Sequence, residues 1–363
     1  MLMGGRLRVA IAGSTGMVGR RFAELLVDNP WFQIDMLVGH KAVGQRYGQV
    51  WERKEKLIQE HYGNDFWHVR SCPEQLRNMC VSSFEELINS DSVDIIFSAM
   101  PSNASELEQA LIDSGRLVFS NSPYGRFDER NPLVVTEVNC EEIKNQTFIK
   151  NPNCVTSGLS MILEPIRARY GLKEVSLVTF QSLSGKGDAK YETDLVVGNV
   201  YPLRNSSERT EEYIRQEIHR IFKESIPISV SCYRVFVQEG HLVNLKIRTE
   251  ERVRSKDEVI QLLRNFNPLA TRGLPSSHGC PLVVLPEAGR PRPFQDSMHN
   301  GGMTVAVGGI CTTDDVFDLG LTYVVNNLIR GAAGGAILNS EFYVSERGGV
   351  VGMKSPERTY SAR

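Results

Sequence analysis

Arg6 to Ala12 (RLRVAIA), followed at once by Gly13 to Gly19 (GSTGMVG), is the stretch that decides the fold. The first seven residues form an apolar run typical of a buried strand, and Arg20 to Val27 continue with helical periodicity. Strand, glycine-rich turn and helix in this order are typical of a dinucleotide-binding turn, where the backbone approaches a pyrophosphate at the helix N-terminus. The residues expected to contact the dinucleotide are Gly13, Ser14, Thr15, Gly16, Met17 and Val18.

The end of the second strand, Gln33 to Val38, indicates which dinucleotide is bound. An NAD site usually has an acidic residue there to hold the ribose 2′-hydroxyl, but Asp35 lies too early in the strand for this role. Lys41, with His40 before it, is available to a 2′-phosphate instead. The pattern favours NADP, and the alternative for Lys41 is an ordinary solvated loop charge.

Strands and helices then alternate through the first 150 residues. Asp94 to Met100 and Leu117 to Asn121 are predicted strands, with a short helix over Glu106 to Ser114 between them. This alternation predicts βαβ units and a parallel sheet. The small Ser98 lies near a strand's carboxyl end, where cofactors lie in open α/β sheets. Trp51 to Met79 shows no pattern that assigns it to an element.

From Val175 onward, longer strands with few helices predict a second, α+β domain with a mixed or antiparallel sheet. The turn 238–240 is expected to join two of the strands as a hairpin. A long helix is expected over Asp314 to Arg330, packing back on the first domain. The predicted strands are Val175 to Leu183, Ser229 to Val237, His241 to Arg248, Val283 to Leu285 and Met303 to Val307, and a charged helix is predicted over Arg209 to Lys223.

Length and composition fit two globular domains. The chain has 363 residues, 41% of them hydrophobic and 23% charged, with a formal net charge of −2. This balance favours neither disorder nor nucleic-acid binding. We expect an NADP-binding domain over 1–150 and 327–363, and a catalytic and dimerisation domain over 151–326. Such sheets often pair protomers, so a homodimer or homotetramer is expected.

The cysteines and histidines indicate a compartment and argue against a metal. The seven cysteines are scattered and form no C-x-x-C pair, and the N-terminal residues lead directly into a strand without a targeting segment. We therefore expect reduced thiols in a cytoplasmic protein that does not enter the membrane. The seven histidines are dispersed, so no metal site is indicated.

Cys154 is the candidate nucleophile. It follows the turn Asn151-Pro152-Asn153 and begins an apolar run with helical spacing, Val155 to Ile166. Unpaired N–H groups and the helix dipole at a helix N-terminus favour a thiolate, the form that attacks carbonyl carbon. The alternative is a buried structural cysteine.

Three later residues fit a site around Cys154. His241 follows Gly240 at a turn and is able to exchange protons with a thiol or a reacting oxygen. Arg234 precedes it by seven residues, and its planar guanidinium is suited to a carboxylate. Gln181, near a strand end, is able to orient a carbonyl by hydrogen bonding. Each alone has an ordinary structural explanation.

Together these segments resemble the aspartate-semialdehyde dehydrogenases, most closely the branch found in archaea and fungi. The matching motifs run in family order along nearly the whole chain. They are 13–19, 151–156 (NPNCVT), 181–185 (QSLSG), 234–241 (RVFVQEGH), 290–293 (RPRP) and 327–335 (NLIRGAAGG).

The resemblance implies a role for each candidate. Cys154 would be the acylated nucleophile and His241 the acid/base. Gln181 would orient the thioester, and Arg234 would bind the substrate α-carboxylate. Arg126, on local sequence a surface charge, would lie near the acyl phosphate.

The resemblance also implies further contacts. Glu212, in the acidic segment of the predicted helix 209–223, would belong to the substrate site. Ser184 and Gly185 would contact the cofactor, and Asn327 would hold the nicotinamide carboxamide. The fold implied is a Rossmann-type domain closed by a C-terminal helix, plus an α+β catalytic and dimerisation domain.

Three positions depart from the family pattern. Val155 stands where Ser or Thr usually follows the cysteine, and Gly39 replaces a serine of the 2′-phosphate loop. Tyr213 falls where the family has a lysine near the phosphate, with Arg215 as its possible substitute. These departures put the phosphate subsite in most doubt.

The activity implied is the NADPH-dependent reductive dephosphorylation of L-4-aspartyl phosphate to L-aspartate 4-semialdehyde through a cysteinyl thioester. This reaction serves the synthesis of lysine and diaminopimelate, threonine and methionine. A related acyl reductase, of the malonyl-CoA reductase or acylglutamyl-phosphate reductase type, uses the same thioester chemistry. A non-catalytic NADP-binding redox sensor is the alternative from another class of protein.

Overall fold

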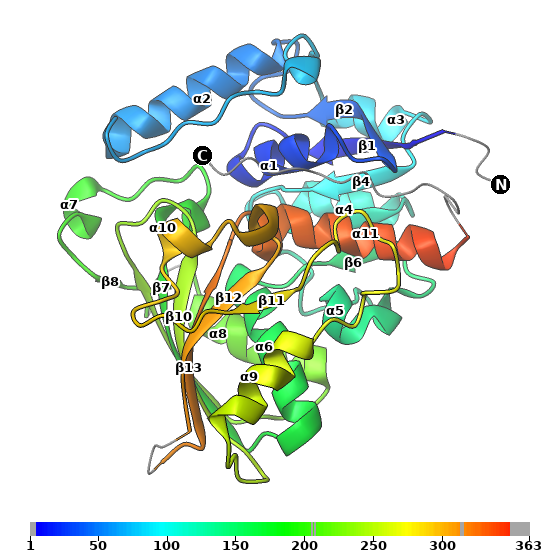
Figure 1. Cartoon of the computed structure of the whole chain (residues 1–363). Coiled ribbons are helices and arrows are strands. Elements are labelled where there is room, and N and C mark those ends of the chain that lie inside the picture. Colours follow the sequence, from blue (N-terminus) through cyan, green and yellow to red (C-terminus); the bar gives the residue numbers. More distant parts are fainter. Residues whose placement is uncertain (1–4, 205, 207, 313–315, 349–363) are drawn as a thin grey trace.

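The computed structural model describes residues 5–204, 206, 208–312 and 316–348. The molecule contains two β-sheets, and each has its own hydrophobic core (Figure 1). The smaller sheet is built from the first 150 residues, and the larger one from residues after Cys154.

The smaller sheet is parallel and has the strand order β3-β2-β1-β4-β5-β6. This confirms the predicted nucleotide-binding architecture, since the order reverses direction between β1 and β4 and leaves a crevice at their carboxyl ends. The two outer strands are only two and three residues long, too short for a periodic pattern to predict them. The strands are β1 (Leu7–Ala12), β2 (Phe32–Val38), β3 (Val81–Ser82), β4 (Ile95–Ser98), β5 (Val118–Ser120) and β6 (Phe148–Lys150).

Helices cover this sheet. The glycine-rich turn leads into α1 as predicted, and the stretch that showed no pattern contains a four-turn helix, α2. The helices are α1 (Met17–Leu26), α2 (Tyr47–Tyr62), α3 (Phe84–Asn89), α4 (Ser105–Asp113) and α5 (Thr136–Asn139), with short 3₁₀ turns η1 (Glu74–Leu76) and η2 (Cys140–Ile143).

The larger sheet is mixed, with the order β11-β12-β13-β10-β7-β9-β8. Its strands alternate between buried and half-buried residues, so one face packs against α6, α8 and α9 and the other stays open. The strands are β7 (Glu174–Gln181), β8 (Tyr201–Pro202), β9 (Ile228–Arg234), β10 (His241–Arg248), β11 (Leu282–Val284), β12 (Val305–Cys311) and β13 (Leu319–Val325). The helices are α6 (Cys154–Tyr170), α7 (Thr193–Val196), α8 (Thr210–Phe222), α9 (Lys256–Asn265) and α10 (Pro293–Asp296), with η3 (Leu183–Lys186) and η4 (His299–Gly302).

Two predictions in this half were wrong. β9 and β10 do not pair as a hairpin; they lie on opposite sides of β7, parallel and antiparallel to it. The helix expected over Asp314 to Arg330 is instead β13, which pairs with β10 and β12; Asp314 itself lies outside the described residues. The β-branched and aromatic residues of β13 fill a central strand position, which helical spacing of the apolar residues alone does not distinguish.

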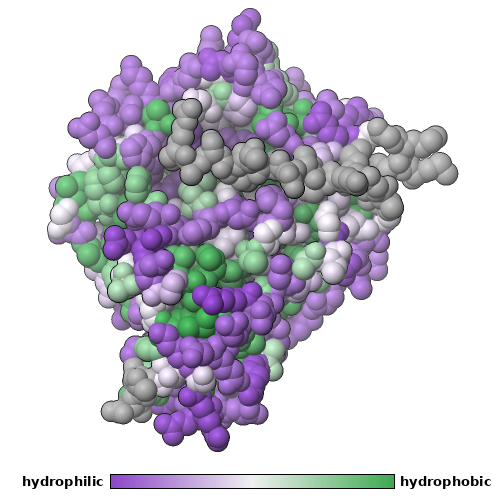
Figure 2. Space-filling model, in the orientation of Figure 1, coloured by the Kyte–Doolittle hydropathy of each residue, from purple (hydrophilic) through white to green (hydrophobic). Residues whose placement is uncertain are grey.

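After β13 the chain returns to the first sheet. A π-helical turn, η5 (Ile329–Ala333), leads into α11 (Gly334–Glu346), and apolar residues of α11 lie in the core of the smaller sheet (Figure 1). In this view the surface is mainly hydrophilic, with hydrophobic residues grouped over the middle of the larger sheet (Figure 2). Among the described helices, none is long and apolar enough to cross a membrane.

Candidate active site

Cys154 is the first residue of α6, as its sequence context predicted. Asn153 caps the helix: its side-chain oxygen accepts a hydrogen bond from the N–H of Val155 at 2.9 Å. The Cys154 sulfur lies 3.2 Å from Nε2 of His241, the first residue of β10. The predicted cysteine and histidine are therefore in direct contact.

Strand order brings the other candidates to the same place. Gln181 ends β7, Arg234 ends β9, and the two are paired across the sheet. His241 begins β10 on the other side of β7. Because β7 lies between β9 and β10, all three residues lie at the same end of these neighbouring strands. A hairpin of β9 and β10 would not produce this arrangement.

The loop after β7 approaches this cluster closely. The N–H of Ser182 donates to His241 Nδ1 at 3.1 Å. A Cβ on Gly185 would lie 2.5 Å from a guanidinium nitrogen of Arg234 and 3.0 Å from Cε1 of His241. Only glycine allows the backbone to pass this close to the two side chains.

Burial dominates the electrostatics of the pair. It raises the pKa of the Cys154 thiol to about 11, although Arg234, Arg126 and the Val155 N–H oppose the shift. Burial and the neighbouring Arg234 both lower the pKa of His241 well below its usual value. Both shifts act against the charged forms of the pair, so they oppose the thiolate expected from the helix N-terminus.

Arg234 is fully buried and surrounded by partners. Its guanidinium donates to the Ser182 carbonyl at 2.7 Å and to the Tyr191 hydroxyl at 3.1 Å, and it pairs with a carboxylate oxygen of Glu208 at 2.5 Å. Tyr191 also donates to Glu208. Neither Tyr191 nor Glu208 was predicted, because both lie in irregular segments without a motif.

Arg126 and Glu217 form a second buried pair beside the cysteine turn, 3.2 Å apart. Glu217 also accepts hydrogen bonds from the Asn153 N–H at 2.7 Å and the Thr156 hydroxyl at 2.6 Å. Burial raises its pKa, with Arg126 opposing the shift. The structure therefore brings Arg126 into the site as predicted.

Glu212 is not brought there. It lies on the exposed side of α8, paired with Arg209 at 2.7 Å, whereas Glu217 of the same helix faces the site. Tyr213, at the position where the family has a lysine, packs against Phe127 with ring centroids 5.4 Å apart. The acidic segment predicted the correct helix but the wrong face.

The residues predicted for the cofactor gather around the turn before α1. Ser14 is buried, and its hydroxyl donates to the Val38 carbonyl at 3.0 Å, which fixes the turn against β2. Lys41 is exposed beyond the end of β2. Ser98, by contrast, donates its hydroxyl to Glu108. Gly13, Thr15 and Gly16 lie in the loop that joins β1 to α1, and Met17 and Val18 are the first two residues of α1.

Asn327 joins two loops of the larger sheet. Its amide oxygen accepts hydrogen bonds from the Ser182 hydroxyl at 3.0 Å and the Gly240 N–H at 2.9 Å, and its amide nitrogen donates to the Ser184 hydroxyl at 2.9 Å. It thus holds the loop after β7 against the turn that carries His241.

Two departures from the family pattern have structural explanations. The side chain of Val155 is fully buried in the core of the second domain, so it takes no polar role at the site. At Gly39 a Cβ would lie 2.9 Å from a methyl group of Val81, which leaves no room for serine.

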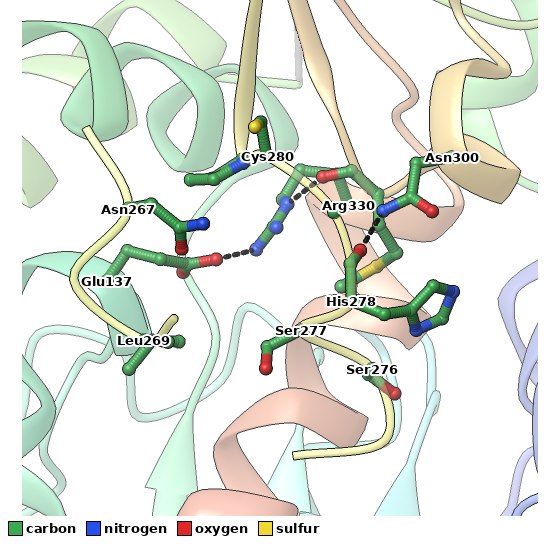
Figure 3. Close-up of a pocket in the computed structure, with 12 residues that line it drawn as sticks. Glu137, Asn267, Leu269, Ser276, Ser277, His278, Cys280, Asn300 and Arg330 are labelled. Atoms are coloured by element: carbon green, nitrogen blue, oxygen red, sulfur yellow. Dashed lines mark hydrogen bonds and ion pairs between the residues drawn. The ribbon is translucent and has the colours of Figure 1, made fainter. Parts of the chain in front are cut away.

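A hollow of about 240 Å³, partly open to solvent, lies elsewhere and contains none of the catalytic candidates (Figure 3). Arg330 crosses it, donating to the Met303 carbonyl and pairing with Glu137, both at 2.7 Å. Its effect is to anchor η5, the turn whose backbone lies against Cys154.

A parallel nucleotide-binding sheet beside a mixed sheet that carries a buried cysteine–histidine pair defines a two-domain dehydrogenase with a thiol at its centre. Residues 8–146 match the family model of the semialdehyde dehydrogenase NAD binding domain, and residues 163–330 match the semialdehyde dehydrogenase dimerisation domain. The chain is an oxidoreductase of this class.

Similarity to individual proteins shows which family within this class the chain belongs to. An aspartate-semialdehyde dehydrogenase of Archaeoglobus fulgidus is 31% identical, with 94% of this chain and 99% of that protein covered. The structure of aspartate semialdehyde dehydrogenase with NADP from Candida albicans superposes with a TM-score of 0.81 at 25% identity, covering 94% and 99% of the two chains. A malonyl-CoA reductase (NADP) of Metallosphaera sedula is 28% identical over 94% of this chain and 97% of its own. The chain belongs to the aspartate-semialdehyde dehydrogenase family.

Proposed function

We propose that the protein reduces L-4-aspartyl phosphate to L-aspartate 4-semialdehyde and phosphate, with NADPH as the reductant. The observation that carries this proposal is the contact between Cys154 and His241, 3.2 Å apart, beside the buried pair of Arg234 and Glu208. The activity would supply the synthesis of lysine and diaminopimelate, threonine and methionine.

Cys154 is the covalent catalyst in this proposal. As a thiolate its sulfur attacks the acyl carbon, phosphate leaves, and a thioester forms on Cys154. Bound NADPH supplies the hydride that reduces the thioester, after which the aldehyde departs and the thiolate is restored. His241 contacts the sulfur, and we expect it to bind the reacting oxygen together with Gln181, which ends the neighbouring strand β7.

Arg234 and Glu208 support an α-amino acid as substrate. Aspartyl phosphate carries an α-carboxylate and an α-ammonium group, and an adjacent guanidinium and carboxylate are complementary to both charges. A malonyl group has no ammonium to meet Glu208. The pair therefore favours the aspartyl substrate over malonyl-CoA, whose reductase is also among the relatives.

The nucleotide turn fits NADP. The loop 13–18 ends at the N-terminus of α1, where N–H groups face a pyrophosphate, and the end of β2 has no carboxylate to repel a 2′-phosphate. Lys41 is exposed at that end. We expect it to meet the 2′-phosphate, and Ser184, Gly185 and Asn327 to line the nicotinamide end.

We also propose a homodimer in the cytoplasm, with a nucleotide domain of 1–150 and 327–363 and a catalytic domain of 151–326. The match to a dimerisation domain and the open face of the larger sheet support the dimer. All seven cysteines are free thiols, as in a reducing compartment.

The test is the reverse reaction, followed as NADPH formation from aspartate semialdehyde. We expect formation to require phosphate and to fail with coenzyme A in its place. Cys154→Ser should lower kcat by at least ~10³ while NADP binding survives, as for other lost covalent nucleophiles. Turnover with malonate semialdehyde and coenzyme A, but not with aspartate semialdehyde and phosphate, would overturn the substrate. Near-normal turnover of Cys154→Ser would overturn the mechanism.

A further inference from the structure

We propose that Asn339 of α11 is a positioning residue for the nucleophile: through Asn151 it sets where Cys154 lies relative to the nucleotide-binding sheet, and Thr136 fixes the orientation of its amide. This inference rests on the proposed thioester reaction. It gives α11, a helix in the core of the smaller sheet, a part in catalysis.

Asn151, which begins the turn before Cys154, is held by three different elements. Its amide nitrogen donates to the Ala332 carbonyl of η5 at 3.0 Å, and its amide oxygen accepts from the amide nitrogen of Asn339 at 2.7 Å. Its backbone N–H donates to the Ser120 carbonyl at the end of β5, at 2.9 Å. Both polar atoms of the side chain therefore have partners, and the turn is fixed at its first residue.

Two backbone carbonyls determine which way both amides point. A carbonyl only accepts hydrogen bonds, so the group of Asn151 that faces Ala332 is its NH₂, and its oxygen faces Asn339. The NH₂ of Asn339 then meets two acceptors, the Asn151 oxygen and the Val134 carbonyl at 3.2 Å. The oxygen of Asn339 accepts from the Thr136 hydroxyl. A flipped amide at either asparagine would set oxygen against oxygen, so the whole chain of hydrogen bonds has one direction.

These side chains lie away from water. Asn151 and Thr136 are 2% exposed and Asn339 is 1% exposed. Leaving a buried polar group without a partner costs more than the net gain from forming its bond, and bonds in a chain support one another. Loss of the Thr136 hydroxyl or of the Asn339 amide is therefore expected to reach Asn151 and to release the turn before Cys154.

The nucleophile and the nucleotide turn belong to different cores, and this contact joins them. Leu338, next to Asn339 in α11, lies in one core with Phe22 of α1, the helix that follows the nucleotide turn. Val155, the second residue of α6, lies in the core of the larger sheet. The hydrogen bond between Asn339 and Asn151 links the two cores at the turn that carries the nucleophile.

Hydride transfer is the step that depends most on this link. The carbon that exchanges the hydride is carried by the Cys154 sulfur, whereas the nicotinamide is expected at the crevice of the smaller sheet. A displacement of about 1 Å between reacting atoms costs about 10²-fold in rate. NADP binding depends on the loop 13–18, which is not part of this chain of hydrogen bonds, so it should survive a displaced turn.

The first test needs no substrate: it measures the rate of alkylation of each cysteine by iodoacetamide, followed by peptide mass spectrometry. Thr136→Val replaces a hydroxyl by a methyl group of similar size, and Asn339→Leu removes the amide. In both variants we expect Cys154 to react at least ~3-fold faster, because a released turn opens locally. The buried Cys72 and Cys232, one in each core, should keep their wild-type rates. Thr136→Ser, which keeps the hydroxyl, should restore the wild-type rate at Cys154. Equal increases at all three cysteines would indicate a general loss of stability and overturn the proposal, as would an unchanged rate at Cys154.

Ser340→Ala is the matched control. Ser340 follows Asn339 in α11 and is also buried, but its hydroxyl donates to the Ile337 carbonyl of the same helix at 2.7 Å. Alkylation of Cys154 and turnover should both stay at wild-type values in this variant. If Ser340→Ala behaves like Thr136→Val, the effect belongs to the stability of α11 and the proposal fails.

Turnover provides the second readout, measured as NADPH formation from aspartate semialdehyde and phosphate. We expect kcat to fall about 10-fold in Thr136→Val and about 10²-fold in Asn339→Leu, with KM for NADP unchanged and kcat recovered in Thr136→Ser. With deuterium in place of the aldehyde hydrogen, the isotope effect on kcat should be at least as large in Thr136→Val as in the wild type, because hydride transfer is the step that slows. A normal kcat, or a smaller isotope effect, would contradict the proposal.

The two readouts separate this proposal from the proposed function. If the wild type does not turn over aspartate semialdehyde, the substrate assignment fails, and the alkylation rates still decide whether Asn339 holds the turn. If Asn339→Leu does not fold, the comparison of Thr136→Val with Thr136→Ser decides alone.

Discussion

Arg234 is bound by protein groups before any substrate arrives. The Ser182 carbonyl and the Tyr191 hydroxyl fix the guanidinium plane, and Glu208 covers one of its terminal nitrogens. Glu208 is partly exposed whereas Arg234 is not, so Glu208 is the member of the pair that a substrate meets first. On the proposed binding of the substrate by this pair, we expect Glu208 to turn away from Arg234 and towards the substrate ammonium.

We predict that Glu208→Gln raises KM for aspartate semialdehyde at least ~10-fold with little change in KM for NADP, because a charge-assisted contact worth about 1.5–3 kcal/mol is lost. Steady-state kinetics with each substrate varied in turn measures this. The contrary outcome is an increase in KM for Glu212→Gln and none for Glu208→Gln, which would return the substrate contact to the exposed face of α8.

Gly331 is the closest backbone neighbour of the nucleophile. A Cβ at this position would lie 2.6 Å from the Cβ of Cys154 and 2.8 Å from its Cα, contacts that no packing tolerates without movement. The π-helical turn η5 thus limits how far Cys154 can shift towards the first domain.

We predict that Gly331→Ala displaces Cys154 and lowers kcat by about 10²-fold, the order expected when a reacting atom moves by about 1 Å. NADP binding should persist, since the turn 13–18 is untouched. Fluorescence titration with NADPH and turnover are the two measurements. A variant with wild-type kcat would mean that the backbone at η5 adjusts freely.

At the scale of elements, the turn before β10 is fastened to the first domain. Glu239 pairs with Arg21 of α1 at 2.7 Å and with Arg70 at 3.1 Å. Gln238 exchanges two hydrogen bonds of 2.9 Å with the backbone of His68. The residue that follows Gly240 is His241, so these contacts tie the position of its imidazole to α1 and the first domain.

We predict that Glu239→Gln lowers the free energy of unfolding by about 3 kcal/mol at pH 7, because it removes the buried carboxylate that pairs with Arg21 and Arg70 and leaves both arginines with Glu24. Burial would raise the pKa of Glu239, but Arg21 and Arg70 together hold it below its usual value. A depressed folded-state pKa stabilises the fold above the unfolded-state pKa and is lost as pH falls through the folded one.

The difference in unfolding free energy between the wild type and Glu239→Gln should therefore be largest at pH 7 and decrease below about pH 4. Urea unfolding at both pH values measures it. As a control, Glu346→Gln removes a more exposed pair with Arg272 and should cost about 1 kcal/mol or less. An equal loss of unfolding free energy in Glu239→Gln and Glu346→Gln would contradict the stabilising role of the Glu239 contacts between the two domains.

The elements that the sequence predicted are those with local signals. The glycine turn with its helix, the cysteine at the start of α6, and most central strands need only nearby residues to be recognised. The neighbours of β7 are different: sequence places β9 and β10 on either side of a short turn, and only the register of the whole sheet separates them. Residues 319–325 became a strand because β10 and β12 provide partners on both sides.

The same distinction holds for the site. Cys154, His241, Arg234 and Gln181 lie in short motifs, so pattern and resemblance located them. Glu208 and Tyr191 were missed because their roles arise from loops that fold over Arg234. Sequence also predicted that the helix N-terminus favours a thiolate, whereas burial, which no local pattern reports, raises the pKa of the thiol.

At the scale of the whole molecule, the larger sheet has one open face, opposite the face that packs against α6, α8 and α9. Its half-buried residues include Val178 and Phe180 of β7 and Leu242 of β10. A second copy of the chain is the expected cover, given the match to a dimerisation domain.

We predict that Val178→Glu converts the dimer to a monomer, because a charge directly opposite the partner's sheet would be buried without a counter-ion. Sedimentation velocity measures the change. The matched control is Leu195→Glu on α7, a hydrophobic residue 41% exposed, which should leave the mass unchanged. A dimer that survives Val178→Glu and dissociates in Leu195→Glu would place the interface at α7.

The return of α11 to the first sheet determines the order in which the two domains can be completed during synthesis. Phe119 of β5 lies against Tyr343, and Leu338 and Phe342 complete the core that β1 begins. A ribosome releases residues 5–150 well before α11, so the nucleotide-binding half emerges with this side of its core uncovered while the catalytic half is still being made. The first domain to be synthesised is therefore the last to be finished, and chaperones have their longest opportunity to act on it during that interval.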